Sequence, residues 1–235
     1  MLKATATCPL TKRLLLTLSF ALSAVILAAC QPSREVAEAP SDIAEIASAA
    51  TAEASSATDE ETGAPLPFSM PVPGGWRTET IPFPLSFAPD LPYEGVEELR
   101  FAPGMFEANN ETFWSYSFVW WIRDQDPTDA ASLSVHLQAY FRGLAAGVAN
   151  VEQATFEVAL EESGDNGVVG TANILDSFST HQQVRLNVHI QRLPCSTVGR
   201  QLVFFALSPQ SRDHSVWEEL GTIRTGVECL AQPGG

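Results

Sequence analysis

Residues 112–123 read TFWSYSFVWWIR, and this stretch decides the fold of the chain. Side chains alternate between the two faces of a strand, and here both faces carry large apolar residues. One face would hold Phe113, Ser115, Ser117, Val119 and Trp121, and the other Trp114, Tyr116, Phe118, Trp120 and Ile122. A strand that is apolar on both sides is typical of a central strand with a packed layer on each face. The stretch therefore predicts a sheet that is covered on both sides.

Weaker patterns before and after this strand predict the other elements. The further expected strands cover residues 77–83, 97–102, 154–161, 168–178, 183–192 and 200–207. Helical spacing predicts a helix at 129–148, capped by Thr128, and a second at 215–229, with Ser215 and Glu218 as a capping box. The order β-β-β-α-β-β-β-β-α predicts an α+β domain, in which two main helices pack on an antiparallel sheet of about six or seven strands.

This order of elements resembles the fold shared by the PsbP oxygen-evolving proteins and some exported bacterial lipoproteins. The resemblance covers most of residues 76–229 and concerns topology only, with no residue motif. It implies a PsbP-like sheet. A helix-grip or cystatin-like sheet is the alternative reading of the same pattern.

The first 30 residues have the zones of a secretory signal. A basic start is followed by an apolar run at residues 14–29, shorter than the roughly 20 residues that a membrane-spanning helix needs. The run ends in Leu27-Ala28-Ala29-Cys30, which resembles the lipobox of bacterial lipoproteins. The resemblance implies that residues 1–29 are removed and that Cys30 carries a diacylglyceryl thioether, with palmitate-type chains that anchor the protein to a membrane. An uncleaved anchor, or an ordinary signal with an incidental cysteine, is the alternative.

Gln31 follows the cysteine, where an Asp tends to retain Gram-negative lipoproteins in the inner membrane. Because position 31 is not an Asp, the sequence favours the outer membrane, with the protein facing the periplasm. Residues 31–66 then carry eight acidic residues, one arginine and no aromatic residue. Such a segment buries too little apolar area to fold and extends by self-repulsion. Residues 30–66 are therefore predicted to be a lipidated, disordered tether, and a binding tail for a basic partner is the alternative.

The part predicted to fold, residues 67–235, is also acidic. It contains nine arginines and 20 acidic residues, and no lysine follows Lys12. This length suits one domain. The negative charge of this part excludes a nucleic-acid partner. Anionic lipid headgroups would repel the domain, so a lipid on Cys30 is needed for membrane attachment.

Cysteine usage fits an exported protein. Cys8 leaves with the signal and Cys30 is lipidated, which leaves Cys195 and Cys229 as an even pair in an oxidising compartment. We expect a disulfide that joins the last helix to the sheet. Two unpaired thiols or a metal site are the alternatives, and His214 is the only histidine near either cysteine in sequence.

Sequence signatures of catalysis are missing: there is no GxSxG, HExxH, CxxC, P-loop or GxGxxG motif. Arg185, Asn187 and His189 share one face of the strand at 183–192, where they could bind an anion or move a proton. The alternative is the solvated side of a sheet. His136 is expected on the flank of the first helix, at the surface.

Asp124, Asp126 and Asp129 have a D-x-D-x-x-D spacing that could hold calcium through oxygen ligands. Pro127 interrupts the spacing, and the Gly and Glu of an EF-hand are missing. Acidic residues at a helix N-terminus are the better interpretation, so neither a metal nor another cofactor is expected.

The aromatic stretch supplies the main candidate for a site. Rings of Trp114, Trp120 and Trp121 could line a ligand cavity or a partner groove, with space beside the small Ser115 and Ser117. A thick core beneath two layers is the alternative. We expect a non-catalytic binding or accessory domain of the cell envelope, for a protein partner or a small apolar ligand. An envelope hydrolase with His189 or His136 as base, and a purely structural lipoprotein, are the other hypotheses.

Overall fold

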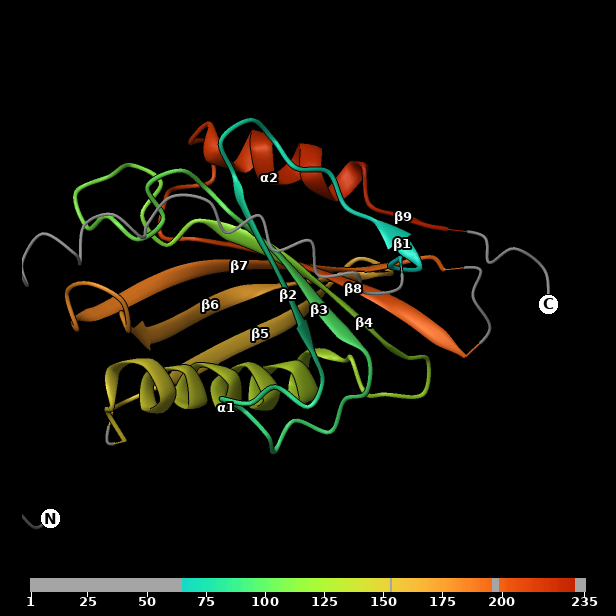
Figure 1. Ribbon diagram of the computed structural model, residues 1–235, viewed down its shortest axis with the longest axis horizontal. Coiled ribbons are helices and arrows are strands. Elements are labelled where there is room, and N and C mark those ends of the chain that lie inside the picture. Colours follow the sequence, from blue (N-terminus) through green and yellow to red (C-terminus); the bar gives the residue numbers. More distant parts are fainter. Residues whose placement is uncertain (1–64, 153, 196–198, 231–235) are drawn as a thin grey trace, which may run out of the picture. The chain divides into compact units, whose positions relative to one another are not determined.

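The computed structural model describes residues 65–152, 154–195 and 199–230 (Figure 1). Within these residues the fold is α+β, with a seven-stranded antiparallel sheet and two helices, as predicted. The elements of this sheet and its helices are β2 (Arg77–Pro82), β3 (Val96–Phe101), β4 (Tyr116–Arg123), α1 (Ala130–Ala149), β5 (Glu157–Ser163), β6 (Gly167–Leu175), β7 (Gln183–Leu193), β8 (Arg200–Ser208) and α2 (Val216–Thr225). No helix in the described part of the chain is long and apolar enough to cross a membrane.

The strand order is β2-β3-β4-β8-β7-β6-β5, and each neighbouring pair is antiparallel. Two meanders, β2-β3-β4 and β5-β6-β7, are therefore joined by β8, the last strand of the sheet in sequence. In the β4–β8 pair, Phe118 lies opposite Phe205. The aromatic stretch thus forms an internal strand, as its pattern predicts.

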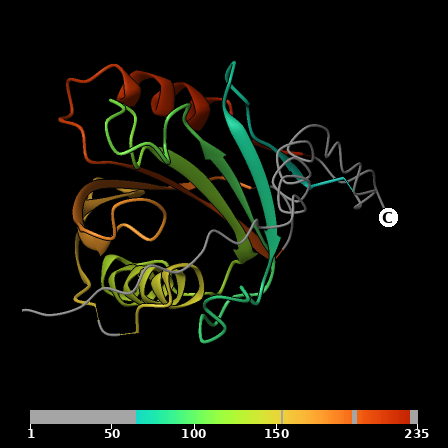
Figure 2. The same cartoon turned by 60° about the vertical axis from the view of Figure 1, so that its left-hand side comes forward.

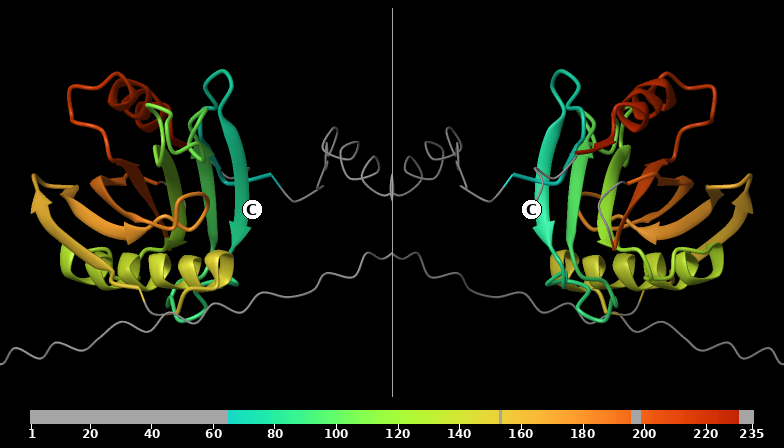
Figure 3. Two further views of the ribbon diagram at one scale, coloured as in Figure 1. Left: turned by 90° about the vertical axis from the view of Figure 1, so that its left-hand side faces the viewer. Right: turned by 90° about the vertical axis from the view of Figure 1, so that its right-hand side faces the viewer.

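Each face of the sheet carries one helix and one hydrophobic core. Figure 2 and Figure 3 show a strongly bent sheet, with α1 on one side and α2 on the other. The larger core lies on the α1 side and includes Phe118 and Leu137, both fully buried. The smaller core lies on the α2 side and includes Val119 and Leu220. Because Phe118 and Val119 are consecutive, the alternation of β4 places its side chains in both cores.

The predicted start of the aromatic strand is wrong by four residues. Residues 112–115 form a turn in which the backbone N–H of Ser115 donates to the carbonyl of Thr112, at 3.0 Å. Trp114 has a φ of 52°, in the left-handed region that bulky residues rarely adopt. The ladders with β3 and β8 begin at Tyr116. Such backbone strain persists where surrounding contacts hold the residue, and it often marks a functional site.

The predicted caps of both helices are wrong. Asp129, and not Thr128, caps α1: its carboxylate accepts from the backbone N–H of Ser132 at 3.0 Å. The Thr128 hydroxyl instead donates to the side chain of Gln201. Ser215 already has helical φ and ψ angles and makes no side-chain cap, so the capping box of α2 is absent.

The chain end beyond α2 also departs from the prediction. The helix ends at Thr225, and β9 (Glu228–Cys229) pairs with β1 (Phe68–Ser69) in a separate two-stranded sheet. The predicted disulfide between Cys195 and Cys229 is confirmed, with Cα atoms 5.1 Å apart. It joins β9, and not the last helix, to the segment that follows β7.

Candidate functional site

A cavity of about 350 Å³ lies between α1 and the β2–β3–β4 end of the sheet. This volume is in the range of sites for small molecules, roughly 300–1,000 Å³. Its walls come from three strands, from α1 and from the loops beside them. The lining residues are Glu79, Thr80, Ile81, Ser86, Phe87, Leu99, Phe101, Met105, Trp114, Tyr116, Tyr140, Leu144, Val148 and Phe178.

Two sequence periods bring these walls together. Alternation along β3 places Leu99 and Phe101 on the α1 side of the sheet, next to Tyr116 of β4. Tyr140, Leu144 and Val148 are spaced by four residues, so they lie along one stripe of α1 that faces the strands. The cavity is therefore formed by the ordinary packing of a helix on a sheet, where the side chains do not fill the gap.

The cavity lining includes two exposed apolar side chains. Val148 and Phe178 are 47% and 37% exposed, unusual for residues of this size. The Phe178 ring packs edge-on against Phe106, with centroids 5.0 Å apart, and lies 5.4 Å from the Trp114 ring. An apolar rim of this kind is typical of a surface that receives an apolar molecule.

Tyr116 of the cavity wall carries a buried polar group without a partner in the described part of the chain. Tyr116 is only 2% exposed, and its hydroxyl has no hydrogen-bond partner within the described residues. Leaving such a group without a partner costs about 1–3 kcal/mol. A tyrosine hydroxyl both donates and accepts, so it could bind a hydroxyl, carbonyl or amine placed in the cavity.

A buried acid lies behind this wall. Glu97 is fully buried on β3, and its Oε1 accepts from Nε1 of Trp120 at 3.0 Å. Its Oε2 has no partner among the described residues. Burial raises the pKa of Glu97 to about 8, although the Trp120 and Tyr140 donors oppose this rise. Glu97 is therefore mainly protonated and uncharged at neutral pH.

The two cavity tyrosines are uncharged as well. Burial raises the pKa of Tyr116 well above its ordinary value, and the nearby Glu97 raises it further. The same two causes raise the pKa of Tyr140. The inner wall of the cavity thus contains two uncharged tyrosines, with a neutral carboxylic acid behind them. It suits a neutral polar group better than an ion.

A second acid holds the outer wall. Nε1 of Trp114 donates to Oδ1 of Asp176 at 2.9 Å, and the backbone N–H of Phe178 donates to the same oxygen at 3.0 Å. Burial alone would raise the pKa of Asp176, but hydrogen bonds from Thr180, Phe178 and Trp114 outweigh it and hold the pKa well below the ordinary value. This charged carboxylate joins the strained Trp114 turn to the Phe178 loop, so it fixes two parts of the wall.

The three tryptophans singled out from the sequence lie in different places. Trp114 lines the cavity. Trp120 is buried in the α1-side core and contacts Glu97. Trp121 points to the α2 side, where the guanidinium of Arg200 lies 4.3 Å from its ring. Ser115 and Ser117 are fully buried and do not line the cavity.

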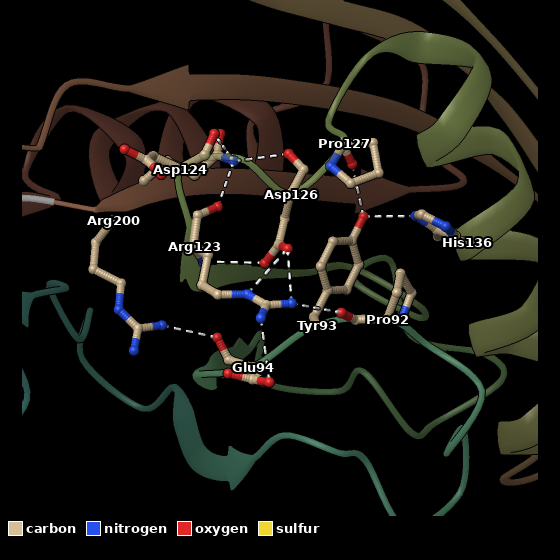
Figure 4. A network of polar contacts seen from close by, with 10 residues as sticks. Pro92, Tyr93, Glu94, Arg123, Asp124, Asp126, Pro127, His136 and Arg200 are labelled. Atoms are coloured by element: carbon tan, nitrogen blue, oxygen red, sulfur yellow. Dashed lines mark hydrogen bonds and ion pairs between the residues drawn. The ribbon is translucent and has the colours of Figure 1, made fainter.

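His136 belongs to a network at the start of α1 (Figure 4). Its Nδ1 lies 2.6 Å from the hydroxyl oxygen of Tyr93, which donates to the carbonyl of Pro127 at 3.0 Å. Burial lowers the pKa of His136, and Asp129 opposes this shift. A catalytic base of the hydrolase type needs a nucleophile or an orienting carboxylate. Here the polar partner of the imidazole is a tyrosine whose pKa burial raises, and the histidine lines no part of the cavity.

The aspartates near this network have other partners. Asp126 accepts from the guanidinium of Arg123, which also pairs with Glu94 at 3.3 Å (Figure 4). Asp129 caps α1. Among the residues that the structure describes, no group of three or more His, Cys, Asp or Glu side chains is placed to hold a metal ion.

Arg185, Asn187 and His189 do share one face of β7, but the structure does not gather them into one site. Arg185 is exposed, and Asn187 donates to the carbonyl of Gln210 at 2.9 Å. His189 lies in a separate hollow beside α2.

Glu97 and Asp176 were not singled out by the sequence. Asp176 precedes Ser and Thr residues, a turn pattern that could have drawn attention to it. Glu97 shares a strand face with Leu99 and Phe101, and an acid within an apolar set is the signal of a buried polar group.

Comparisons of this chain with models of protein families, with curated proteins and with solved structures gave no match. The resemblance to the PsbP fold stays a prediction. A proposal for function has to start from the cavity.

Proposed function

We propose that this protein is a membrane-anchored binding protein of the bacterial cell envelope, which holds a small and mainly apolar molecule between α1 and β2–β4. The observation that carries the proposal is an aromatic cavity of about 350 Å³ whose wall includes Tyr116, a residue whose buried hydroxyl has no protein partner among the described residues. Buried polar groups in native proteins are hydrogen-bonded. A bound molecule would supply the missing partner.

The walls limit the chemistry of this molecule. Met105, Leu144 and Phe87 offer only apolar surface, which favours a hydrocarbon or aromatic body. The inner tyrosines and the protonated Glu97 favour one uncharged hydrogen-bonding group on the ligand. We propose a neutral amphiphile of small size, bound with its polar group at Tyr116 and its apolar end at Val148 and Phe178.

The membrane anchor rests on Leu27-Ala28-Ala29-Cys30, which lies outside the described residues. A lipid on Cys30 and the acidic spacer after it would hold the cavity close to a membrane, where apolar molecules concentrate. Cys30→Ser is expected to abolish labelling by radioactive palmitate and membrane attachment. A variant that still incorporates palmitate would contradict the anchor.

Purification from the protein's own envelope tests the ligand. The full-length protein would be extracted in a non-ionic detergent, and small molecules bound to it identified by mass spectrometry. We expect a neutral amphiphile in the wild type and in Val135→Trp, which adds bulk on the exposed side of α1. The same molecule should be missing from Leu144→Trp, which adds bulk inside the cavity. Equal recovery from both variants, or none from the wild type, would contradict the proposal.

A further inference from the structure

The opposite face of the sheet carries a second, smaller hollow of about 190 Å³, between β7, β8 and α2. Its floor is apolar and includes Phe204, Trp217 and Leu220. Its polar side chains are His189 of β7, Arg212 from the loop before α2, and Arg224 near the end of α2. Three groups that carry or accept positive charge thus meet in a chain whose net charge is −15.

The two arginines are held in place by uncharged contacts. The Arg212 guanidinium stacks on the Trp217 ring, 4.0 Å from its centroid, and donates to the carbonyl of Val188 at 3.0 Å. Arg224 donates to the side-chain oxygen of Gln191. Each guanidinium has five N–H donors, so most donors stay unused in these contacts. Neither arginine has a carboxylate partner among the described residues.

His189 completes the set. Within the described residues its imidazole makes no hydrogen bond. Burial lowers the pKa of His189, and the charges of Arg212 and Arg224 lower it further. The two guanidinium charges face a half-buried imidazole that has no partner among the described residues, so an anion bound between them would be stabilised by both charges and by hydrogen bonds.

We propose that this pocket, formed by His189, Arg212 and Arg224 over Trp217 and Phe204, binds an oxyanion, that is, a phosphate or carboxylate group with an apolar part attached. Guanidinium groups match the two oxygens of such an anion, and the apolar floor would contact the rest of the molecule. This site is on the other face of the sheet from the cavity beside α1, so it does not depend on the function proposed above. The anion could come from a soluble ester or from a phospholipid headgroup.

Calorimetric titration of the full-length protein in a non-ionic detergent tests this site, with phenyl phosphate as the probe. Arg212→Gln and Arg224→Gln are each expected to weaken binding about tenfold, the value of one charge-assisted hydrogen bond. Arg185→Gln is the matched control, because Arg185 is exposed on the same face of β7 but does not line the pocket. Inorganic phosphate should bind more weakly than phenyl phosphate, since it lacks the apolar part.

Two further measurements make the outcome decisive. The Cε1 proton signal of His189, identified by its loss in His189→Ala, should shift in the wild type when phenyl phosphate is added, and this needs no arginine variant. Dihexanoylphosphatidylglycerol distinguishes the sources: competition supports a headgroup, and binding of phenyl phosphate without competition supports a soluble ester. The absence of saturable binding, or equal weakening by Arg185→Gln, would overturn the proposal.

Discussion

Nε1 of Trp120 donates a hydrogen bond of 3.0 Å to Oε1 of Glu97, and both side chains are fully buried. The two residues lie directly opposite each other in the β3–β4 ladder. The strand register therefore places an acid against the aromatic side chains of the α1-side core, next to Tyr140 of α1. This relationship keeps the region behind the cavity polar but uncharged.

Glu97 should make stability depend on pH. Its pKa in the folded protein is about 8, against an ordinary value of 4.5. Between these two pKa values the folded state keeps a proton that the unfolded chain has released. The contribution of Glu97 to stability is therefore complete below pH 4.5, decreases as the pH rises, and is lost once the pH has passed 8. The slope from this group is about 1.4 kcal/mol for each pH unit. Urea unfolding of Glu97→Gln, which keeps an acceptor for Trp120, should show this slope removed. Glu157→Gln, exposed on β5, should retain it, and a slope that persists in Glu97→Gln would contradict the assignment.

Tyr116→Phe should separate stability from binding. Removing a buried hydroxyl without a partner should leave the unliganded protein as stable as before, or more stable by up to about 1–3 kcal/mol. The same change should weaken ligand binding about five- to tenfold, because one hydrogen bond to the ligand is lost. Tyr93→Phe is the control: its hydroxyl contacts Pro127 and His136, so its loss should destabilise the protein. Denaturant unfolding that shows equal destabilisation in both variants would argue against an unpartnered hydroxyl.

Asp176→Asn should loosen the outer wall of the cavity. Both oxygens of the Asp176 carboxylate accept hydrogen bonds, from Trp114 and from the backbone of Phe178 and Thr180. The side-chain amide of an asparagine has only one oxygen that can accept. We expect a loss of about 2–3 kcal/mol in the free energy of unfolding. Because the pKa of Asp176 is held well below its ordinary 3.8, its contribution is present above that pH and is lost as the pH falls further. Asp165→Asn in the exposed β5–β6 turn is the control, and equal stability of the two variants would refute the role of Asp176.

The disulfide should stabilise the end of the chain. A separation of 34 residues between Cys195 and Cys229 corresponds to about 3–4 kcal/mol in the chain-entropy description. Thermal and urea unfolding of Cys195→Ser combined with Cys229→Ser should show this loss. Peptide mapping of the wild type without reduction should recover the two cysteines in one linked fragment. Recovery of both as free thiols would contradict the bond.

The sequence predicted the elements of the fold because their periods are strong. The alternation in 116–123 and the helical stripe of 130–149 both reflect burial, and the spacing of apolar residues in the sequence shows it directly. The strand order could not be predicted, since the insertion of β8 between β4 and β7 joins residues far apart in the chain. The late start of β4 was missed because the left-handed Trp114 is held by Asp176, a tertiary contact with no local signal.

The candidate site was harder to predict than the fold. The tryptophans suggested an aromatic cavity, but their three indoles point in different directions, and only Trp114 lines it. Tyr116 and Glu97 are polar groups at and behind the cavity wall, and their burial depends on the packing of α1 on the sheet. Burial and missing partners are properties of packing, and a sequence pattern does not record them.

Native mass spectrometry of the full-length protein, released from detergent and titrated with 1-naphthol, would show whether the cavity beside α1 binds a neutral aromatic molecule. This probe is a neutral aromatic molecule with one hydroxyl, which matches the walls and the Tyr116 group of the cavity. We expect saturable binding of one molecule to the wild type and to Val135→Trp, weaker binding to Tyr116→Phe, and none to Leu144→Trp. Binding that is equally strong in Leu144→Trp, or no saturable binding to the wild type, would contradict the assignment of this cavity as the ligand site.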